Sequence, residues 1–229
     1  MQIFLDTADS REIEKYLSSG LIDGVTTNPS IMYKDGVRDL REGAGKLSSL
    51  ISPLPLSVEV TSNDPEEMYL QAKEFSSWGE NIVVKIPQIN TEGVPCYGVM
   101  HKLEEEGIRV NATVAMSLAQ VILSAKAGAT YISIFAGRIT DEGGSAGDVI
   151  SDAREWLESW DYKSRIIVGS IRSVGDILTA AMSGAHIITI PPQFISKMAD
   201  HKYSRETVRQ FLDDAKRAMR EMESSGAKR

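Results

Sequence analysis

Short apolar runs alternate along the chain with longer segments in which apolar residues recur every three or four positions. The short runs are typical of β-strands buried on both faces, and the longer segments are typical of amphipathic helices. The runs predict eight strands, at Gln2–Asp6, Gly24–Asn28, Leu56–Val60, Ile82–Ile86, Ile108–Thr113, Tyr131–Phe135, Ile166–Ser170 and His186–Ile190.

Helix start and stop signals support this alternation. Asp9 and Ser173 each have an acidic residue three positions further on, as in a capping box. Glycines end the helical segments, at Gly20, Gly79, Gly107, Gly128 and Gly184. Eight strand–helix units in 229 residues predict an α/β fold of the (β/α)8 TIM barrel type, as a single domain over residues 1–229. A doubly wound parallel sheet is the alternative.

Composition narrows the choice of partners. The chain has 25 basic and 32 acidic residues and a net charge of −7, so we expect it to bind neither nucleic acid nor a membrane. Its one cysteine, Cys96, and its three histidines lack metal-site spacing, so we expect no metal and a reducing, cytoplasmic location. No apolar run approaches the ~20 residues that span a bilayer, so we expect a soluble, unprocessed protein.

The alternation of side chains along each strand indicates where polar residues point. Outward side chains of a barrel strand meet the helices and are apolar, so polar residues in the opposite phase point inward. The inward residues near the carboxyl ends of the strands are Asp6, Ser57, Glu59, Lys85, Asn111, Thr113, Ser133, Phe135 and Ser170. Because barrel enzymes carry their active sites at this end, we predict an active site there.

Lys85 is the most informative of these residues. Burying an ammonium group costs on the order of several kcal/mol unless partners compensate it, so its inward position needs a reason. A lysine at the rigid end of a strand, in a pocket with little water, is suited to form a Schiff base with a carbonyl as an uncharged nucleophile. The alternatives are a structural ion pair with Glu59 or Asp6, or a side chain that extends out of the barrel mouth.

Two other motifs approximate catalytic signatures. Gly143–Gly147 has the spacing of a hydrolase nucleophile elbow, but a loop separates Ser145 from the preceding predicted strand. Gly43–Lys46 approximates a phosphate-binding loop, but Leu40 and Leu47 stand where a glycine and a hydroxyl residue are required. We therefore predict neither chemistry.

Several motifs at the predicted strand ends are specific enough to suggest a family. They are Leu5-Asp6-Thr7-Ala8, Asp23-Gly24-Val25-Thr26-Thr27-Asn28-Pro29-Ser30, Val83-Val84-Lys85-Ile86-Pro87, Asn111-Ala112-Thr113, Phe135-Ala136-Gly137-Arg138 and Ser170-Ile171-Arg172. Together they resemble the transaldolase family, in the short subfamily that also contains fructose-6-phosphate aldolases. The resemblance implies a (β/α)8 barrel and a cofactor-free transfer of a dihydroxyacetone unit between sugar phosphates.

The resemblance also implies residue roles. Lys85 would form the Schiff base, and Asp6 would be the general base at the C4 hydroxyl. Glu59 would move protons during imine formation and hydrolysis, together with Thr113 and a water. The sugar would be held by Thr26, Asn28, Asn111, Ser133 and Phe135, and its phosphate group by Arg138, Ser170 and Arg172.

Two positions favour a transaldolase over an aldolase. Glu59 stands where the aldolases resemble one another in carrying glutamine, and Phe135 stands where they carry tyrosine. We predict transfer from sedoheptulose 7-phosphate or fructose 6-phosphate to glyceraldehyde 3-phosphate or erythrose 4-phosphate, in the non-oxidative pentose phosphate pathway. The alternatives are a fructose-6-phosphate aldolase that releases free dihydroxyacetone and a non-catalytic sugar-phosphate-binding barrel.

A further amphipathic helix is predicted at residues 204–222, beyond the eighth strand–helix unit. Its apolar stripe comprises Val208, Phe211, Leu212, Ala215 and Met219. The stripe could fold back on its own barrel, but we favour packing on a neighbouring subunit. The resemblance implies such a homo-oligomer, since short transaldolases form pentamers that pair into decamers. We expect residues 223–229 to be a frayed tail.

Overall fold

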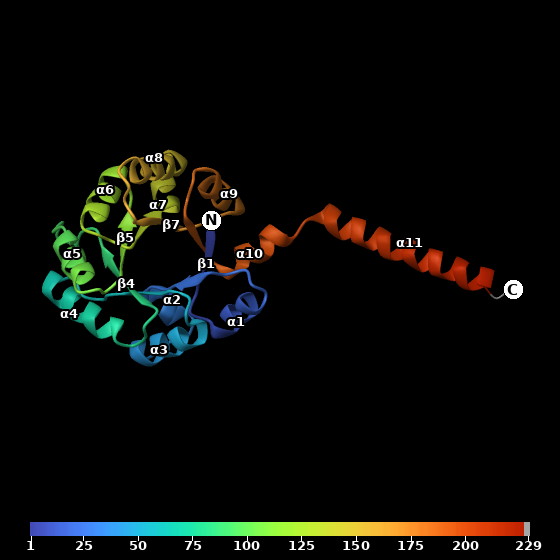
Figure 1. Ribbon diagram of the computed structural model, residues 1–229, viewed down its shortest axis with the longest axis horizontal. Coiled ribbons are helices and arrows are strands. Elements are labelled where there is room, and N and C mark those ends of the chain that lie inside the picture. Colours follow the sequence, from blue (N-terminus) through green and yellow to red (C-terminus); the bar gives the residue numbers. More distant parts are fainter. Residues whose placement is uncertain (227–229) are drawn as a thin grey trace. The chain divides into compact units, whose positions relative to one another are not determined.

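Eight parallel strands form a closed barrel in sequence order, with the first strand paired to the last (Figure 1). The computed structural model describes residues 1–226. The strands are β1 (Gln2–Asp6), β2 (Gly24–Thr26), β3 (Leu56–Glu59), β4 (Ile82–Pro87), β5 (Val110–Ala115), β6 (Tyr131–Phe135), β7 (Arg165–Gly169) and β8 (Ile187–Ile190). Because β1 pairs with β8, the barrel is closed; the predicted (β/α)8 fold is confirmed and the doubly wound sheet is excluded.

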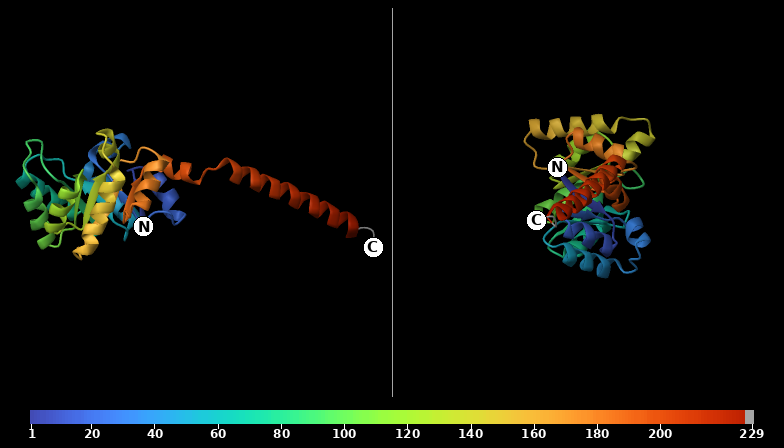
Figure 2. Two further views of the ribbon diagram at one scale, coloured as in Figure 1. Left: turned by 90° about the horizontal axis from the view of Figure 1, so that it is seen from above. Right: turned by 90° about the vertical axis from the view of Figure 1, so that its right-hand side faces the viewer.

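Helices surround the strands (Figures 1 and 2). They are α1 (Ser10–Ser18), α2 (Pro29–Lys34), α3 (Leu40–Ile51), α4 (Pro65–Ser76), α5 (Tyr97–Glu105), α6 (Leu118–Lys126), α7 (Ala136–Asp141), α8 (Ala146–Ser159) and α9 (Val174–Met182). Two helices follow β2 and two follow β6, where the sequence pattern predicts one helical segment each.

Side-chain caps fix where several helices begin. Ser173 and Asp176 form the predicted capping box at the start of α9. Asp9 caps α1 in a different way from the prediction, because its carboxylate accepts the backbone N–H of Arg11 and forms no box with Glu12. The starts of the helices were therefore predictable, but one cap geometry was not.

β2 ends two residues earlier than predicted, because Asn28 belongs to the start of the next helix. The side-chain Oδ1 of Asn28 accepts the backbone N–H of Ile31 at 2.9 Å, which makes Asn28 the N-cap of α2. The strand therefore stops at Thr26.

β5 begins and ends two residues later than predicted, and it is irregular. Its register with β6 shifts between Ala112 and Ala115. Within this bulge Val114 has a φ of 63°, a left-handed conformation that branched side chains rarely adopt. Bulges commonly redirect a side chain beside an active site, and Thr113 lies in this one.

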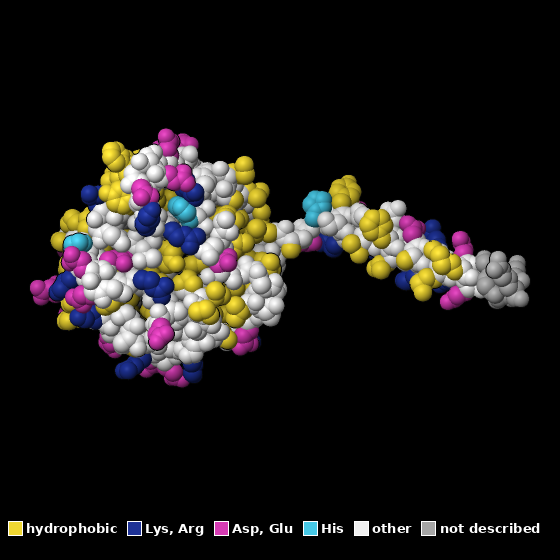
Figure 3. Space-filling view, viewed as in Figure 1, with side chains coloured by type: hydrophobic (Ala, Val, Ile, Leu, Met, Phe, Trp, Pro, Cys, Tyr) yellow, Lys and Arg dark blue, Asp and Glu magenta, His cyan; other side chains and the backbone are white. Residues whose placement is uncertain are grey.

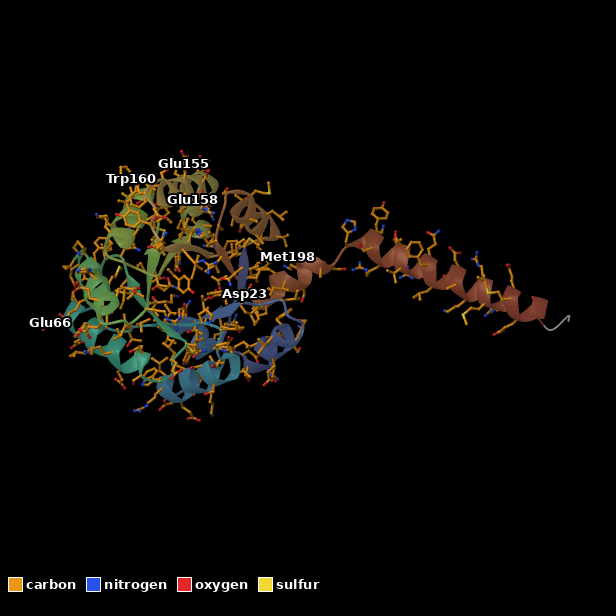
Figure 4. The ribbon with its side chains drawn as sticks, viewed as in Figure 1. Asp23, Glu66, Glu155, Glu158, Trp160 and Met198 are labelled. Atoms are coloured by element: carbon orange, nitrogen blue, oxygen red, sulfur yellow. The ribbon has the colours of Figure 1, made fainter. Side chains whose placement is uncertain are left out.

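Apolar side chains fill the barrel interior below the polar residues. The cluster comprises Phe4, Val83, Tyr131, Ile167 and Ile187. Gly24 makes room for it, since a Cβ at this position would lie 2.7 Å from the Phe4 ring. Asp23, labelled in Figure 4, joins the two strands beside it by accepting the backbone N–H of Ile3 at 2.9 Å. The polar layer therefore rests on a close-packed base.

The chain divides after Pro192, the first residue of α10 (Pro192–Ala199), and the second unit contains the rest of α10 and α11 (Lys202–Gly226). α11 is longer than the helix predicted at 204–222 and continues through residues expected to fray. Its side chains Val208, Phe211, Leu212 and Met219 are each more than half exposed, and Figure 3 shows the hydrophobic side chains along this helix. Residues 227–229 of the predicted tail lie outside the described residues. No helix in the described part of the chain is long and apolar enough to cross a membrane.

Candidate functional site

Lys85 lies inside the barrel near the end of β4 and is only 5% exposed. Its Nζ lies 3.0 Å from Glu59 Oε2 and donates a hydrogen bond to the backbone carbonyl of Thr27, also at 3.0 Å. Glu59 is the register partner of Lys85 on β3, and in a parallel sheet such partners point to the same face. A buried amine is thus paired with a carboxylate that can accept or return a proton. Both side chains point inward as predicted, and their ion pair is the one named as the alternative for Lys85.

Asp6 ends β1 and supplies a second carboxylate. Its Oδ1 accepts the hydroxyl hydrogen of Thr26 at 2.7 Å. Burial raises the pKa of Asp6, while the Thr26 bond and the charge of Lys85 act in the opposite direction. A carboxylate with a raised pKa is a stronger base than one in water, which suits it to remove a proton from a hydroxyl group.

Asn111 connects two hydroxyl groups inside the barrel. Ser133 Oγ donates to Asn111 Oδ1 at 2.7 Å, and Asn111 Nδ2 donates to Ser57 Oγ at 3.2 Å. These bonds fix the Asn111 side chain, which is fully buried. Its amide therefore holds Ser133 in place. Ser133 lines a cavity at this end of the barrel, whereas Asn111 does not.

A cavity of about 190 Å³ opens at the carboxyl ends of the strands. Its volume suits a small metabolite rather than a polymer. The residues that line it are Asp6, Thr26, Asn28, Lys85, Ser133, Phe135, Arg138, Gly169, Ser170 and Thr189. Eight of the twelve predicted site residues are in this set, and they come from both halves of the chain.

The other four predicted residues lie off the cavity lining. Glu59 is paired with Lys85, and Asn111 supports Ser133. Thr113 is buried, and its hydroxyl has no hydrogen-bond partner within the part of the chain that the structure describes. A free hydroxyl of this kind is suited to hold a water molecule. Arg172 is also absent from the lining.

Arg138 and Ser170 line the cavity, whereas Arg172 is paired with Asp141. A guanidinium nitrogen of Arg172 lies 2.6 Å from Asp141 Oδ2, and both side chains are about half exposed. Gly137 allows the start of α7 to approach the end of β7 closely, because a Cβ at this position would lie 2.2 Å from the backbone oxygen of Ser170. The structure therefore places one of the two predicted phosphate-binding arginines at the cavity.

Thr189 and Gly169 line the cavity although neither was among the predicted site residues. Thr189 lies on β8, where the alternation in Ile187-Ile188-Thr189-Ile190 places it in phase with the inward Ile187. The same rule that located Lys85 could therefore have located Thr189. Gly169 was missed because the predicted phase of this strand, which put Ser170 inward, was wrong. Ile167 and Gly169 are in the inward phase of β7, and Ser170 reaches the cavity from beyond the strand end, where its φ is 60°.

The two other motifs singled out in the sequence have structural roles. Ser145 caps α8 by accepting the backbone N–H of Asp148, and Gly43 lies within α3, so neither motif forms the catalytic structure that it approximates. A larger cavity of about 610 Å³ adjoins α7, α8 and α9, but its lining includes no lysine, arginine, histidine or cysteine. Within residues 1–226, no group of three or more His, Cys, Asp or Glu side chains could hold a metal ion.

Comparison with known proteins identifies relatives over nearly the whole chain. A family model described as transaldolase/fructose-6-phosphate aldolase matches residues 3–228. A probable transaldolase of Lactiplantibacillus plantarum is 40% identical over 216 residues, covering 94% of this chain and 97% of that protein. Probable transaldolases of Anaeromyxobacter sp. and Streptococcus equi subsp. zooepidemicus are 40% and 38% identical, each covering 93% of this chain and 97% of the relative. These matches confirm the resemblance seen in the motifs.

Proposed function

The chain belongs to the transaldolase/fructose-6-phosphate aldolase family, and on this premise we propose that it is a transaldolase that works through a Schiff base at Lys85. The observation that carries the proposal is the placement of a buried amine and two carboxylates at one small cavity. Lys85 is paired with Glu59, while Asp6 lies on another strand with its own hydroxyl partner. Imine chemistry and carbon–carbon bond cleavage need separate proton carriers, and this arrangement provides them.

Schiff-base formation uses Lys85 and Glu59. Glu59 takes a proton from the Lys85 ammonium, and the uncharged amine attacks the C2 carbonyl of a ketose phosphate. A second amine proton passes to the carbonyl oxygen and gives the carbinolamine. Glu59 then returns its proton to the carbinolamine hydroxyl group, which departs as water and leaves the protonated imine. The 3.0 Å separation of the two side chains supports this transfer. The unpaired Thr113 hydroxyl is assigned to hold the water that takes part.

Cleavage uses Asp6. Its carboxylate takes the proton from the C4 hydroxyl, the C3–C4 bond breaks, and an aldose phosphate leaves while the protonated imine accepts the electron pair as an enamine. The same steps in reverse join the bound dihydroxyacetone unit to an acceptor aldose phosphate. We assign the sugar hydroxyls to Thr26, Asn28 and Ser133, and the phosphate to Arg138 and Ser170, all of which line the cavity. Asn111 would act through its hydrogen bond to Ser133, and Arg172 would join the phosphate site by exchanging Asp141 for the phosphate.

Transfer to an acceptor is favoured over release of free dihydroxyacetone. Phe135 lines the cavity and carries no hydroxyl group that could protonate the enamine carbon. Glu59 is ionisable, unlike the glutamine of the related aldolases. The proposed donors are sedoheptulose 7-phosphate and fructose 6-phosphate, and the proposed acceptors are glyceraldehyde 3-phosphate and erythrose 4-phosphate, in the non-oxidative pentose phosphate pathway.

Cellular setting and assembly are part of the proposal. The single cysteine supports a reducing, cytoplasmic location, and the reaction as written needs no metal or cofactor. The exposed apolar side chains of α11 support a homo-oligomer, pentameric or decameric, in which this helix packs on a neighbouring subunit.

Borohydride trapping tests the function. The full chain is incubated with fructose 6-phosphate and sodium borohydride, and the intact mass and a peptide map are measured. We expect a covalent adduct at Lys85 that is absent from the Lys85→Met variant. An unchanged mass, together with activity that EDTA abolishes, would contradict the proposal, and sugar-phosphate binding without an adduct would indicate a non-catalytic barrel.

A coupled assay then separates transferase from aldolase. Fructose 6-phosphate is supplied with and without erythrose 4-phosphate, and both free dihydroxyacetone and sedoheptulose 7-phosphate are measured. We expect rapid turnover only when the acceptor is present. Rapid release of dihydroxyacetone without an acceptor would identify an aldolase.

A further inference from the structure

Thr189 takes part in a short chain of hydrogen bonds that ends on Asp6. Its Oγ1 lies 2.5 Å from Thr26 Oγ1, and Thr26 Oγ1 lies 2.7 Å from Asp6 Oδ1. Both threonines are buried, with 6% and 2% of their surface exposed. The chain crosses the inside of the barrel from β8 to β2, over the end of β1, which lies between them.

The direction of these bonds follows from the number of hydrogens. An ionised carboxylate only accepts, and each threonine hydroxyl has one hydrogen. When Asp6 is ionised, the Thr26 hydrogen is used on Asp6, so the bond between the two threonines must use the hydrogen of Thr189. Thr189 therefore donates to Thr26, and Thr26 donates to Asp6.

We propose that Thr189 is a positioning residue that acts through Thr26 to hold Asp6 oriented and ionised for proton removal. The role in catalysis rests on the proposed function, since it assumes that Asp6 is the base. Donation by Thr189 polarises the Thr26 hydroxyl and strengthens its bond to the carboxylate, because consecutive hydrogen bonds reinforce one another where water is excluded. It also fixes the single rotation of the Thr26 hydroxyl that points its hydrogen at Asp6.

This support matters because the surroundings of Asp6 otherwise oppose its charge. Burial raises the pKa of Asp6, and the carboxylates of Asp35 and Glu59 raise it further. Lys85 lowers it, and Arg138 is a second cation that lines the same cavity. Both cations are assigned to other tasks, Lys85 to the imine and Arg138 to the phosphate. The proposed reaction gives Thr189 no task of its own, so its bond to Thr26 is available to support Asp6.

A packing role for Thr189 can be separated from this one. The methyl group of Thr189 faces Gly169, where a Cβ would lie 3.3 Å from it. Thr189→Val keeps this methyl and replaces only the hydroxyl, and valine is well tolerated in a strand. Thr189→Ser keeps the hydroxyl and removes the methyl. Comparison of the two variants therefore separates the effect of the hydroxyl group from the effect of methyl packing.

The test measures the Asp6 carboxyl directly, by ¹³C NMR titration of the full chain without substrate. We expect Thr189→Val to move the Asp6 titration to a pH higher by about 0.5 to 1, and Thr189→Ser to leave it in place. In a Thr26→Val background, Thr189→Val should have no further effect, because the link is already broken. An unchanged Asp6 titration in Thr189→Val, or the same effect in Thr189→Ser, would overturn the proposal.

Kinetics extend the test to the reaction. For Thr189→Val we expect kcat for cleavage to fall about 5-fold at neutral pH, the acid limb of the pH profile to move upward, and borohydride trapping at Lys85 to persist. Thr189→Ser should restore the acid limb. If the unaltered protein forms no adduct, the proposed function fails, whereas the Asp6 titration still decides whether Thr189 supports this carboxylate. A loss of thermal stability with an unmoved acid limb would show that Thr189 is only structural.

Discussion

Glu59 and Lys85 occupy paired positions in the register of β3 and β4, and 3.0 Å separates Glu59 Oε2 from Lys85 Nζ. The backbone itself therefore brings the two side chains to the same face and level of the barrel. This geometry fits a purely structural ion pair, which is the alternative for Lys85. It is also the geometry that proton transfer to and from the amine requires. The two interpretations differ in what happens when Glu59 can no longer carry a proton.

Replacement of Glu59 by glutamine should slow imine formation. Glutamine keeps the size and hydrogen-bonding capacity of the side chain but does not exchange a proton, so the rate of borohydride trapping at Lys85 should fall about 100-fold. Stopped-time trapping followed by mass measurement gives this rate. Glu59→Ala should act in the same direction. An unaffected trapping rate in Glu59→Gln, with a loss of folding stability, would favour the structural ion pair.

Replacement of Asp6 should separate trapping from cleavage. Asp6→Asn keeps an oxygen for the Thr26 hydrogen bond but removes the base, so trapping should persist while cleavage falls at least about 100-fold. Asp6→Ala should show the same split. The measurements are adduct mass and release of aldose phosphate in the same sample. Loss of trapping with cleavage retained would reverse the roles assigned to Asp6 and Glu59.

Phe135→Tyr should shift the balance from transfer to release. A hydroxyl group at the cavity wall supplies a proton source for the enamine carbon, so free dihydroxyacetone formed per transfer event should rise about tenfold. Phe135→Leu is the matched control, because it changes the ring without adding a hydroxyl group. If the tyrosine variant and the unaltered protein form the same amount of free dihydroxyacetone per transfer event, the missing hydroxyl group at position 135 does not explain why turnover needs an acceptor.

His186 should make the stability of the barrel depend on pH. Its Nδ1 accepts the backbone N–H of Ile166 at 3.0 Å, and burial, followed by Arg154 and Arg165, lowers the pKa of His186 to about 4. Because the folded state binds this proton less readily than the unfolded chain, stability is complete above pH ~6.5 and is lost as the pH falls towards 4.

The expected loss of unfolding free energy at low pH is about 2 kcal/mol, allowing for the partial exposure of His186. Urea unfolding at pH 7 and pH 4.5 measures it. His186→Asn offers an acceptor that does not titrate, so its unfolding free energy should change less between the two pH values. Equal pH dependence in both proteins would show that His186 does not cause the loss.

Truncation after Tyr203 should reduce assembly. It removes nearly all of α11, including the exposed side chains Val208, Phe211 and Leu212. We expect light scattering to give a smaller species than the full chain, with a lower thermal midpoint. Phe211→Asp should weaken assembly in the same direction without shortening the chain. A monomeric full-length protein would contradict the predicted homo-oligomer.

The barrel and most of the cavity could be predicted from the sequence, because both follow from two patterns. These are the alternation of side chains along strands and the recurrence of apolar residues every three or four positions along helices. Strand alternation places Asp6, Lys85 and Ser133 inward, and all three line the cavity. Thr189 was overlooked because it stands in an isoleucine-rich strand that reads as core. The alternation rule covers it, but a lone threonine on an apolar strand gives no chemical signal by itself.

Contacts between segments that are distant in the sequence could not be predicted from these patterns. The pairing of Arg172 with Asp141 joins the loop before α9 to the end of α7, 31 positions earlier, and no local pattern specifies it. Asn28 was predicted as a sugar ligand, yet its role as the cap of α2 depends on where β2 ends. The bulge around Val114 likewise arises from the pairing of β5 with β6 rather than from the sequence of β5 alone.

The pairing of β1 with β8 makes the cavity a late product of folding. Asp6 is among the first residues of the chain, while Thr189 comes 183 residues later, so the hydroxyl chain between them closes only when the final strand docks. On the ribosome, a partly synthesised chain would hold the base, its threonine partner and the lysine but would leave the wall between β7 and β1 open. The site and the seam of the barrel would thus be completed in the same event, and an incomplete barrel would have no enclosed place in which a reactive enamine could persist.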